Sequence, residues 1–198
     1  MSDYEDYACF EDCKNKCRAC SIGPIYDKVV LSTGCKTNPK VMIIGEAPGK
    51  DEIEAGEPFV GKAGKLLRLV LKNCGFCKAN TLISNIIPCR PENNKFPQDV
   101  QLVKDCYDRW LKNEILLLQP DYMLLLGAQP LKYILNMSGI TNLRGKWYDY
   151  TLNKVIKCMP TFHPSYVLRK QYMKEGKIIK RDFERDIKMV ATQAGLVV

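Results

Sequence analysis

The sequence predicts an α/β protein with a mainly parallel sheet, and two observations support this prediction. Short apolar runs alternate along the chain with longer segments whose apolar residues recur at helical spacing. The clearest run, residues 41–44 (VMII), is followed at once by Gly45, which suits a strand buried in a parallel sheet. Alternation of this kind is the pattern of a sheet covered by helices.

The expected strands are short and apolar. The run at 122–126 comes just after Pro120 and ends at Gly127, so turn residues bound it on both sides. The strands that we expect cover residues 41–44, 81–87 and 122–126, and a hairpin or edge pair covers 147–150 and 154–157. Residues 158–160 lead from this pair into the segment TFHPSYVLR.

The expected helices begin or end at residues that commonly bound helices. Gly75 stops the first helix, and Pro97 precedes the second. In the second helix Val103 and Leu111 fall near one face, as do Phe183 and Ile187 in the last. The helices that we expect cover residues 63–73, 98–118, 128–135 and 183–191.

The composition is that of a globular protein, and we expect residues 1–198 to form one domain. No apolar run nears the roughly 20 residues that span a bilayer. Residues 1–16 form an acidic N-terminal extension without the apolar core of a signal peptide. We therefore expect an intracellular protein, in a cytoplasm or nucleoid, or in a nucleus or virus factory. The net charge of +8 favours a polyanionic partner such as nucleic acid.

Three segments follow the carboxyl ends of the expected strands, where ligands bind in such sheets. They are GEAPGKDE at 45–52, the stretch 85–97 and TFHPSY at 161–166, and we expect them to build one site. The first continues into GEPFVGKA, which nearly matches the phosphate-loop pattern. Because Ala63 lacks the hydroxyl that would hold magnesium and Pro58 lacks an amide donor, we exclude a nucleoside triphosphate site.

Two ring side chains in these loops have both a structural and a functional interpretation. Phe59 is either a core aromatic under the loop or a ring that stacks on a flat ligand. His163 is the chain's one histidine, and Pro164 favours an extended backbone beside it. A lone histidine is usually structural, but a position after a strand lets its ring point into a site.

Ten cysteines in a chain expected to be intracellular favour metal ligation or redox chemistry over disulfides. Cys17 and Cys20 have the two-residue spacing at which both thiolates reach one metal centre. Cys89 and Cys106 would complete one set of four, whereas CGFC at 74–77 would complete a rival zinc set. The spacing decides neither between iron–sulfur and zinc nor between these two sets.

The order of the motifs resembles that of the iron–sulfur (family 4) uracil-DNA glycosylases, from Cys17 to the final helix. The matching segments are CRAC at 17–20, GEAPGKDE at 45–52, GEPFVGKAGKLL at 56–67, SNIIPCRPENNKFP at 84–97, Cys106, LLLG at 124–127, LRGKW at 143–147 and HPSYVLR at 163–169. The resemblance implies a three-layer α/β/α sandwich with a central, mainly parallel four-stranded sheet. It also implies a [4Fe–4S] cluster on Cys17, Cys20, Cys89 and Cys106, with CGFC outside.

The activity that the resemblance implies is hydrolysis of the N-glycosidic bond of uracil flipped out of DNA. This reaction leaves an abasic site for base excision repair. Phe59 would stack on the base, while Asn85 would accept from uracil N3–H and donate to O4, a pattern that cytosine reverses. His163, as a neutral ring, would donate to the O2 region of the departing uracil. Backbone amides of the loop 46–49 would add donors, and its substrate-binding residues would be Glu46, Ala47 and Gly49.

The resemblance also gives Glu52 a catalytic role, with Asp51 as a neighbouring candidate. Glu52 would orient water, stabilise the cationic sugar or exclude the thymine methyl group. Better-known uracil glycosylases position water with an aspartate where this chain has Ala47, so that route is absent. The residues expected to contact DNA, through phosphates or as an apolar wedge in a loop, are Lys62, Lys95, Ser165, Tyr166, Leu168 and Arg169.

The chain also departs from the family pattern. Ile53 stands where a second acid is common, and Glu92 replaces a proline. Two alternatives therefore stay open: a glycosylase of the same fold that acts on another modified pyrimidine, and a non-catalytic iron–sulfur DNA-binding module. We exclude a related family that forms a covalent adduct with DNA, because Ala47 replaces its glutamine and a second histidine is missing. We expect a monomer that binds single- or double-stranded DNA and no membrane.

Overall fold

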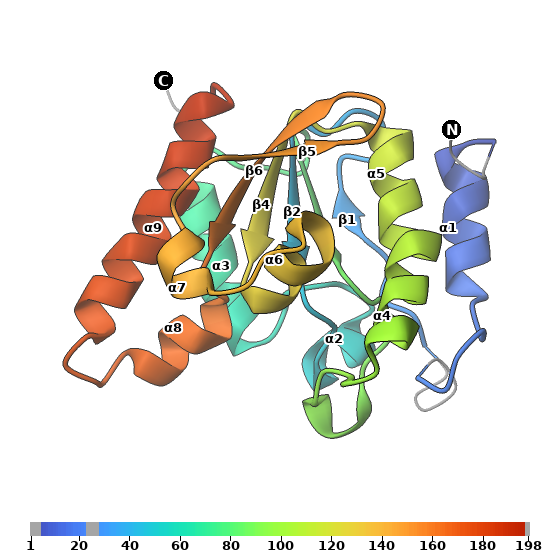
Figure 1. Ribbon diagram of the computed structural model, residues 1–198, viewed down its shortest axis with the longest axis horizontal. Coiled ribbons are helices and arrows are strands. Elements are labelled where there is room, and N and C mark those ends of the chain that lie inside the picture. The colour runs from blue at the N-terminus through green and yellow to red at the C-terminus, as the bar shows by residue number, and fades with distance from the viewer. Residues whose placement is uncertain (1–4, 23–27, 197–198) are drawn as a thin grey trace.

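The computed structural model describes residues 5–22 and 28–196. Within them, strands form one sheet in the order β1-β3-β2-β4-β6-β5 (Figure 1). The four inner strands are parallel, and each edge strand is antiparallel to its neighbour. The strands are β1 (Thr33–Gly34), β2 (Val41–Gly45), β3 (Thr81–Asn85), β4 (Tyr122–Leu126), β5 (Tyr148–Thr151) and β6 (Val155–Thr161).

The predicted α/β class and its four parallel strands are confirmed, but the sheet is wider than the four strands expected. β1 has only two residues, so no periodic pattern in the sequence indicates it. β5 and β6 form the expected hairpin. β6 then continues to Thr161, because Cys158 and Met159 are fully buried beside β4.

Helices cover both faces of the sheet and give three layers (Figure 1). One face packs against α3 (Lys62–Asn73), α8 (Pro164–Lys170) and α9 (Gly176–Gln193). The other face packs against α4 (Val100–Cys106), α5 (Lys112–Leu118) and α6 (Ala128–Leu135). Shorter elements are α2 (Lys50–Ala55), a 3₁₀ turn at Glu92–Asn94 and α7 (Ile140–Leu143). In the described part of the chain, no helix is both long and apolar enough to cross a membrane.

The expected helix at 98–118 contains a wide turn. Residues Tyr107–Leu111 form a π-helical turn between α4 and α5. The side-chain amide of Asn113 donates to the carbonyl oxygens of Asp108 and Arg109 at 3.2 and 3.1 Å. A π turn changes the phase of the helix, so the residues before and after it face different neighbours than an unbroken α-helix would give.

The acidic extension is a structured part of the fold, at least over its described residues. Helix α1 (Tyr7–Asn15) lies on the outer side of α5 (Figure 1), and Phe10 is fully buried with its ring centroid 6.0 Å from that of Trp110. The apolar residues of α1 show only a weak helical period, because the contact of α1 with α5 is largely polar. Lys14 pairs with the buried Glu114 at 3.1 Å, and the hydroxyl of Tyr7 donates to the same carboxylate at 2.6 Å.

Glu114 also ties α5 to the sheet. Ser84 of β3 donates its hydroxyl hydrogen to the Glu114 carboxylate at 2.8 Å, and Ser32 donates to Ser84 at 2.8 Å. The carboxylate is fully buried, yet the positive charge of Lys14 and these hydrogen bonds keep its pKa below the usual value against the effect of burial. The strand that ends at Asn85 is thereby joined to the N-terminal helix.

Candidate active site

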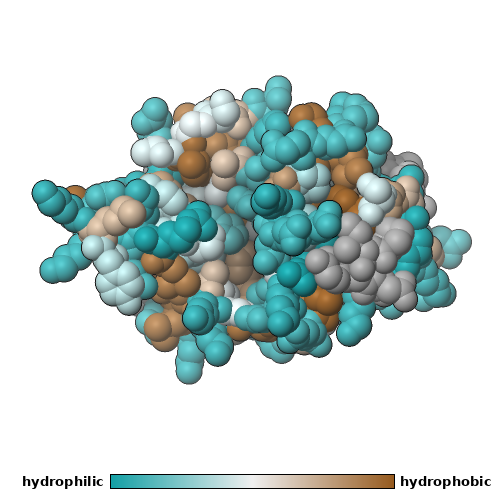
Figure 2. Space-filling model, turned by 90° about the horizontal axis from the view of Figure 1, so that it is seen from below, coloured by the Kyte–Doolittle hydropathy of each residue, from teal (hydrophilic) through white to brown (hydrophobic). Residues whose placement is uncertain are grey.

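A pocket of about 240 Å³ lies beyond the carboxyl ends of β2, β3 and β6, where the sequence predicted a site. Figure 2 views the molecule from this side and shows a hollow near the middle of the face. The three loops that the sequence singled out all contribute to it. The sequence-predicted residues that line it are Glu46, Ala47, Gly49, Glu52, Phe59, Asn85, His163 and Ser165.

Asn85 is the last residue of β3 and is 7% exposed. Among the described residues its Oδ1 atom has no hydrogen-bond partner. A Cβ atom on Gly45, the residue paired with it in β2, would lie 2.5 Å from this oxygen, so only glycine leaves room for the amide. An unsatisfied buried carbonyl costs roughly 1–3 kcal/mol, which marks this oxygen as an acceptor available to a ligand.

Phe59 is buried and lines the same pocket. Its backbone is left-handed, with φ of 56°, a conformation that costs a bulky residue on the order of 1–3 kcal/mol. Two glycines accommodate it. A Cβ on Gly45 would lie 2.4 Å from the ring, and one on Gly64 would lie 2.0 Å from the Phe59 carbonyl oxygen. The ring centroid lies 6.0 Å from that of His163, so the two rings flank one space.

Glu52 and Arg68 hold this strained segment from two sides. One oxygen of the Glu52 carboxylate accepts from the backbone N–H of Gly49 at 3.0 Å. The other accepts from the N–H groups of residues 60–61, both at 3.0 Å. Arg68 donates through Nε to the carbonyl oxygen of Phe59 at 2.9 Å. Both carboxylate oxygens therefore accept hydrogen bonds from the backbone, and these contacts add a positioning role to the three roles that the sequence left open.

His163 caps the start of α8 with its own side chain. Its Nδ1 accepts from the backbone N–H of Ser165 at 3.2 Å and lies 2.8 Å from the Ser165 hydroxyl. Arg169 donates to that hydroxyl oxygen at 3.1 Å, which directs the hydroxyl hydrogen toward Nδ1. With Nδ1 as acceptor, the neutral ring carries its hydrogen on Nε2. Burial, followed by the charge of Arg169, lowers the pKa of His163 to about 4, so the ring is neutral near pH 7.

Glu46 is the second carboxylate of the pocket, and it lies beside His163. A Cβ on Gly127 would lie 3.0 Å from Cβ of His163 and 3.2 Å from Oε1 of Glu46, so both side chains border that glycine. Gly127 has φ of 94°, which also favours glycine there. Burial raises the pKa of Glu46, and the charge of Arg169 opposes this effect. The sequence indicated Glu46 only as a member of its loop. The fold places its carboxylate near His163, the candidate catalytic histidine.

Five of the expected DNA-contacting residues do not line the pocket: Lys62, Lys95, Tyr166, Leu168 and Arg169. The expected loop at 166–169 is instead part of α8. A helix forms here because Pro164 occupies its first turn and His163 caps it. Val167 is buried in the core, and the Tyr166 ring packs on Phe162 at 5.2 Å between centroids.

Sequence reasoning missed several lining residues. Two lie after Phe59 on α3, and three lie in the segment that follows β3. Asn94 has a left-handed backbone with φ of 55° within this turn. All of them fall within the motif segments at 56–67 and 84–97, but nothing in their residue types assigned them individually to the pocket. The missed residues are Ala63, Gly64, Pro91, Asn94 and Phe96.

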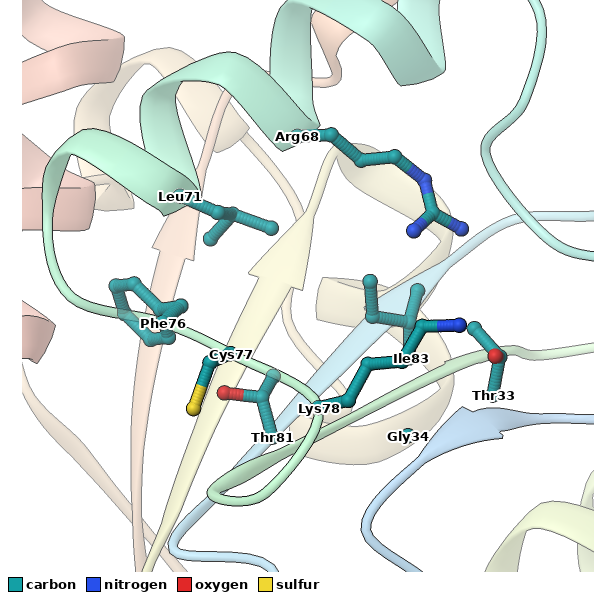
Figure 3. A pocket seen from close by; sticks show the side chains of 9 residues that line it. All are labelled: Thr33, Gly34, Arg68, Leu71, Phe76, Cys77, Lys78, Thr81 and Ile83. Atoms are coloured by element: carbon teal, nitrogen blue, oxygen red, sulfur yellow. The ribbon is translucent and has the colours of Figure 1, made fainter.

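A second cavity of about 190 Å³ lies beside β1, near the start of β3 (Figure 3). Leu71, Phe76 and Ile83 give it an apolar lining, and Arg68 and Lys78 also reach it. Arg68 links this cavity to the pocket, since it lines the cavity and donates to the carbonyl oxygen of Phe59, which lines the pocket. Within the described residues, the side-chain atoms of this second cavity include no buried unsatisfied acceptor.

The cysteines divide between the two faces of the sheet. Cys20, Cys89 and Cys106 belong to the core on the side of α4 and α5, whereas Cys74 packs on the side of α3 and α9. Burial first, and then the charges of the neighbouring cysteines, including Cys17, raise the pKa of both Cys89 and Cys106 to about 12. The rival set with CGFC is thus divided by the sheet, and the first set lies together.

The first set also fits an iron–sulfur cluster in its donor chemistry. Cys17, Cys20 and Cys106 line one cavity of about 330 Å³ beside α4. In the ranges that the structure describes, no three His, Cys, Asp or Glu side chains converge as ligands of a single ion. Each iron of a [4Fe–4S] cluster takes one thiolate, so the four thiols surround a space and do not meet at one point. Three of the four cysteines line this cavity, and the fourth, Cys89, lies near enough for the charges of Cys17 and Cys20 to raise its pKa, so the set matches that requirement.

The comparison with protein families agrees with this geometry. The model of the uracil DNA glycosylase superfamily matches residues 31–187. The chain belongs to this superfamily. The match begins after the first two cluster cysteine candidates and includes every loop of the pocket. It confirms the family and the fold class that the motifs indicated.

Curated members of the superfamily are similar over most of their length. A type-4 uracil-DNA glycosylase of Thermotoga maritima is 34% identical over 172 residues, which cover 86% of this chain and 87% of that protein. The type-4 enzyme of Sulfurisphaera tokodaii is 33% identical over 176 residues, 85% of this chain and 78% of its own. The type-4 enzyme of Archaeoglobus fulgidus is 31% identical over 185 residues, which cover 90% of this chain and 88% of that protein.

Proposed function

We propose that this protein is a uracil-DNA glycosylase that hydrolyses the N-glycosidic bond of uracil in DNA and leaves an abasic site. The names of the similar proteins and the superfamily match support the reaction class. The single observation that favours uracil is the unpaired Oδ1 of Asn85 in a pocket that also holds an aromatic ring and a neutral histidine.

Recognition of uracil follows from the Asn85 amide. Its Oδ1 accepts from N3–H of the base, and its Nδ2 donates to O4. Cytosine presents an acceptor and a donor at the same two positions, so it would leave buried groups unpaired on both sides. Phe59 stacks on the face of the base, and Gly45 keeps the approach to both side chains open. The base must leave the duplex to reach this depth.

Cleavage breaks the bond between C1′ of the sugar and N1 of uracil. The electron pair leaves with the base, so negative charge grows on uracil and positive charge on the sugar. His163 donates its Nε2 hydrogen bond to O2 of the departing base and stabilises that charge. Ser165 and Arg169 hold the ring in the required tautomer. Water then adds to C1′, and a proton passes to the departing base.

The two pocket carboxylates have different tasks. Glu46 lies beside His163 and is the carboxylate that we assign to the cationic sugar and the attacking water. Both carboxylate oxygens of Glu52 accept hydrogen bonds from backbone N–H groups, and Glu52 thereby positions Gly49 and the segment that contains Phe59. Because the Gly49 N–H is bound to Glu52, that amide is not a donor for the base. Ala47 lines the pocket beside Glu46 and adds no polar group.

The remaining predicted DNA contacts lie outside the pocket, as phosphate contacts should. Arg169 is exposed at the end of α8, and Lys62 starts α3. Lys95 follows the turn that borders the pocket. Tyr166 and Leu168 are partly exposed on α8 and would face the DNA from there. Cations at these positions make binding fall steeply with salt.

The four cysteines Cys17, Cys20, Cys89 and Cys106 would hold the [4Fe–4S] cluster. When bound, the cluster supplies four iron–thiolate bonds that join the N-terminal segment to the β3–α4 connection. Hydrolysis needs no electron, so we assign the group a structural task. Purified protein should contain iron and acid-labile sulfide in equal amounts. Cys106→Ser should lose both, while Cys74→Ser keeps them.

A cleavage assay tests the function. Labelled oligonucleotides would carry one uracil, cytosine, thymine or other modified pyrimidine, single-stranded or in a duplex, and alkali would cut the abasic sites. We expect cuts only at uracil, which fall sharply in Asn85→Ala and persist in the surface control Asn73→Ala. Cuts only at another pyrimidine would mean that this pyrimidine, and not uracil, is the substrate. An iron-loaded protein that cuts none of them would favour a non-catalytic DNA-binding module.

A further inference from the structure

We propose that the connection between α8 and α9, residues 171–175, is a second contact with duplex DNA, about three nucleotides from the flipped base. We call this segment the hook. The inference rests on the proposed glycosylase function and adds a surface that lies outside the pocket. The motif HPSYVLR ends at Arg169, so none of the residues predicted from the sequence to contact DNA belongs to the hook.

The hook exposes apolar side chains that a folded protein ordinarily covers. Tyr172 is 92% exposed, and Met173 beside it is 50% exposed. Ile178 on the first turns of α9 is 53% exposed. By contrast, Val167 in the predicted wedge is 2% exposed. The exposed aromatic group at this end of the molecule is therefore Tyr172, and aromatic rings of this kind pack against bases and sugars.

The hook is a turn held by hydrogen bonds and an ion pair. The backbone N–H of Met173 donates to the carbonyl of Lys170, and that of Gly176 to the carbonyl of Met173, both at 2.9 Å. The side chains of Lys170 and Glu175 pair across it at 3.3 Å. A Cβ on Gly176 would lie 2.3 Å from the Lys170 carbonyl oxygen, so glycine lets α9 start against the end of α8. The position of Tyr172 is thus fixed by its own backbone before any partner binds.

The charge around the hook matches a polyanion. Residues 169–181 contain six lysines and arginines and one acid. Glu175 is bound to Lys170. Within the described part of the chain, Lys174 and Lys177 form no ion pair, and both are exposed. Figure 2 views the molecule from below, and its left end is the end at which α8 and α9 meet in Figure 1. The side chains there are mainly hydrophilic, with apolar ones among them.

The distance from the pocket suits a duplex. Helix α8 has seven residues and begins beside His163. At about 1.5 Å per residue it places the hook roughly 10 Å from the histidine. One strand of a duplex rises by roughly 3.4 Å per nucleotide along the helix axis, so this distance spans about three nucleotides along that axis. The carboxyl ends of β2 and β6, beyond which the pocket lies, and the connection between α8 and α9 are all toward the lower side of the molecule in Figure 1. A duplex whose uracil enters the pocket would therefore pass the hook on one flank.

The experiment compares one uracil-containing strand alone and in duplex. Removing a stacking contact typically costs about tenfold, so Tyr172→Ala should lower kcat/KM on the duplex about tenfold and on the single strand less than twofold. Val155→Ala, which removes another exposed apolar side chain, 52% exposed on the β5–β6 hairpin, is the control and should change neither. An equal loss on both substrates, or no loss, would overturn the inference.

A binding measurement separates this inference from the proposed function. Fluorescence anisotropy with a duplex that lacks uracil needs no catalysis. Lys174→Ala/Lys177→Ala should reduce the slope of log K against log salt by about two, while Lys72→Ala on α3 leaves it unchanged. A protein that cuts no uracil but shows this reduced slope loses the proposed reaction and keeps the hook. If the slope is unchanged and the enzyme cuts uracil, the proposed reaction stands and the hook is overturned. Self-association that Tyr172→Ala abolishes would make the hook a protein contact instead.

Discussion

Two cavities of similar size lie on either side of the segment that contains Phe59, and they differ in chemistry. The pocket at the carboxyl ends of the strands has about 240 Å³ and the cavity beside β1 about 190 Å³. The first contains an unpaired buried acceptor, a neutral histidine and a carboxylate. The second is lined mostly by well-packed apolar groups. Volume alone therefore does not separate the two cavities, whereas a buried unsatisfied side-chain atom among the described residues lines the pocket and not the cavity beside β1.

The two cavities also differ in what holds them open. The pocket depends on left-handed backbone at Phe59, on glycines and on side chains that bind backbone amides. The cavity beside β1 depends on ordinary core packing. We expect substitutions in the pocket to change activity more than stability, and substitutions beside β1 to do the opposite.

The largest effect should come from Asn85→Ala. Loss of both hydrogen bonds to the base should lower kcat/KM on uracil by about 10³-fold or more. Because the same change removes a buried unpaired carbonyl, the free energy of unfolding should stay the same or rise. Urea unfolding measured beside the cleavage assay checks both. A large loss of stability would show that Asn85 is bound in the free protein.

The next effect concerns His163. His163→Ala should lower kcat by about 10²-fold, since one preorganised donor to the departing base is lost. Its folded pKa of about 4 lies below the unfolded value, so the unfolded state takes up a proton first as pH falls. Stability from this residue is complete above pH 6.5 and declines as pH falls toward about 4. Unfolding of wild type should show this decline, on the order of 3 kcal/mol. His163→Gln should lack it.

A smaller effect is expected for Glu52→Gln. A glutamine amide has one acceptor oxygen, so at least one of the three backbone N–H bonds is lost and none is charge-assisted. We expect kcat/KM to fall about tenfold, with stability lower by about 1–2 kcal/mol. Because the residue acts through Phe59, the pH profile should keep its shape. A profile that loses one limb would instead make Glu52 a group that exchanges protons with the substrate.

The smallest effect on activity should come from the cavity beside β1. Leu71→Ala should lower the free energy of unfolding by about 2–4 kcal/mol, because a buried side chain leaves a void. At a temperature where the variant is folded, kcat/KM on uracil should match wild type within about twofold. A large loss of activity would mean that this cavity acts on Phe59 through Arg68, and the contrast between the two cavities would fail.

Much of this arrangement could be predicted from the chain, because the relevant signals are local. Apolar runs ending in glycine located β2 and β4, and the three loops after the parallel strands were recognised before their geometry was known. The roles of Phe59, Asn85 and His163 as a group were implied by the family resemblance, while local signals alone left Phe59 and His163 open. Each occupies a loop or strand end with distinctive neighbours, and the parallel sheet then brings these ends together.

What could not be predicted depends on contacts between distant segments. The sequence left three roles open for Glu52, and its hydrogen bonds to residues 60–61 form only once the loop is folded. Helix α1 lacked a strong apolar period, because its stability comes from a polar contact with Glu114, about one hundred residues away. The exposure of Tyr172 likewise depends on how α8 and α9 meet. None of these has a signature in the adjacent sequence.

The wide turn at Tyr107–Leu111 limits how the gene can change in length. Each residue rotates a helix by about 100°, so deleting one codon there would restore a regular helix and swing Cys106 away from its present direction relative to Glu114. A single lost or gained codon would thus separate a cysteine on one side of the turn from a buried carboxylate on the other. Descendants that keep both residues should keep the number of codons between them.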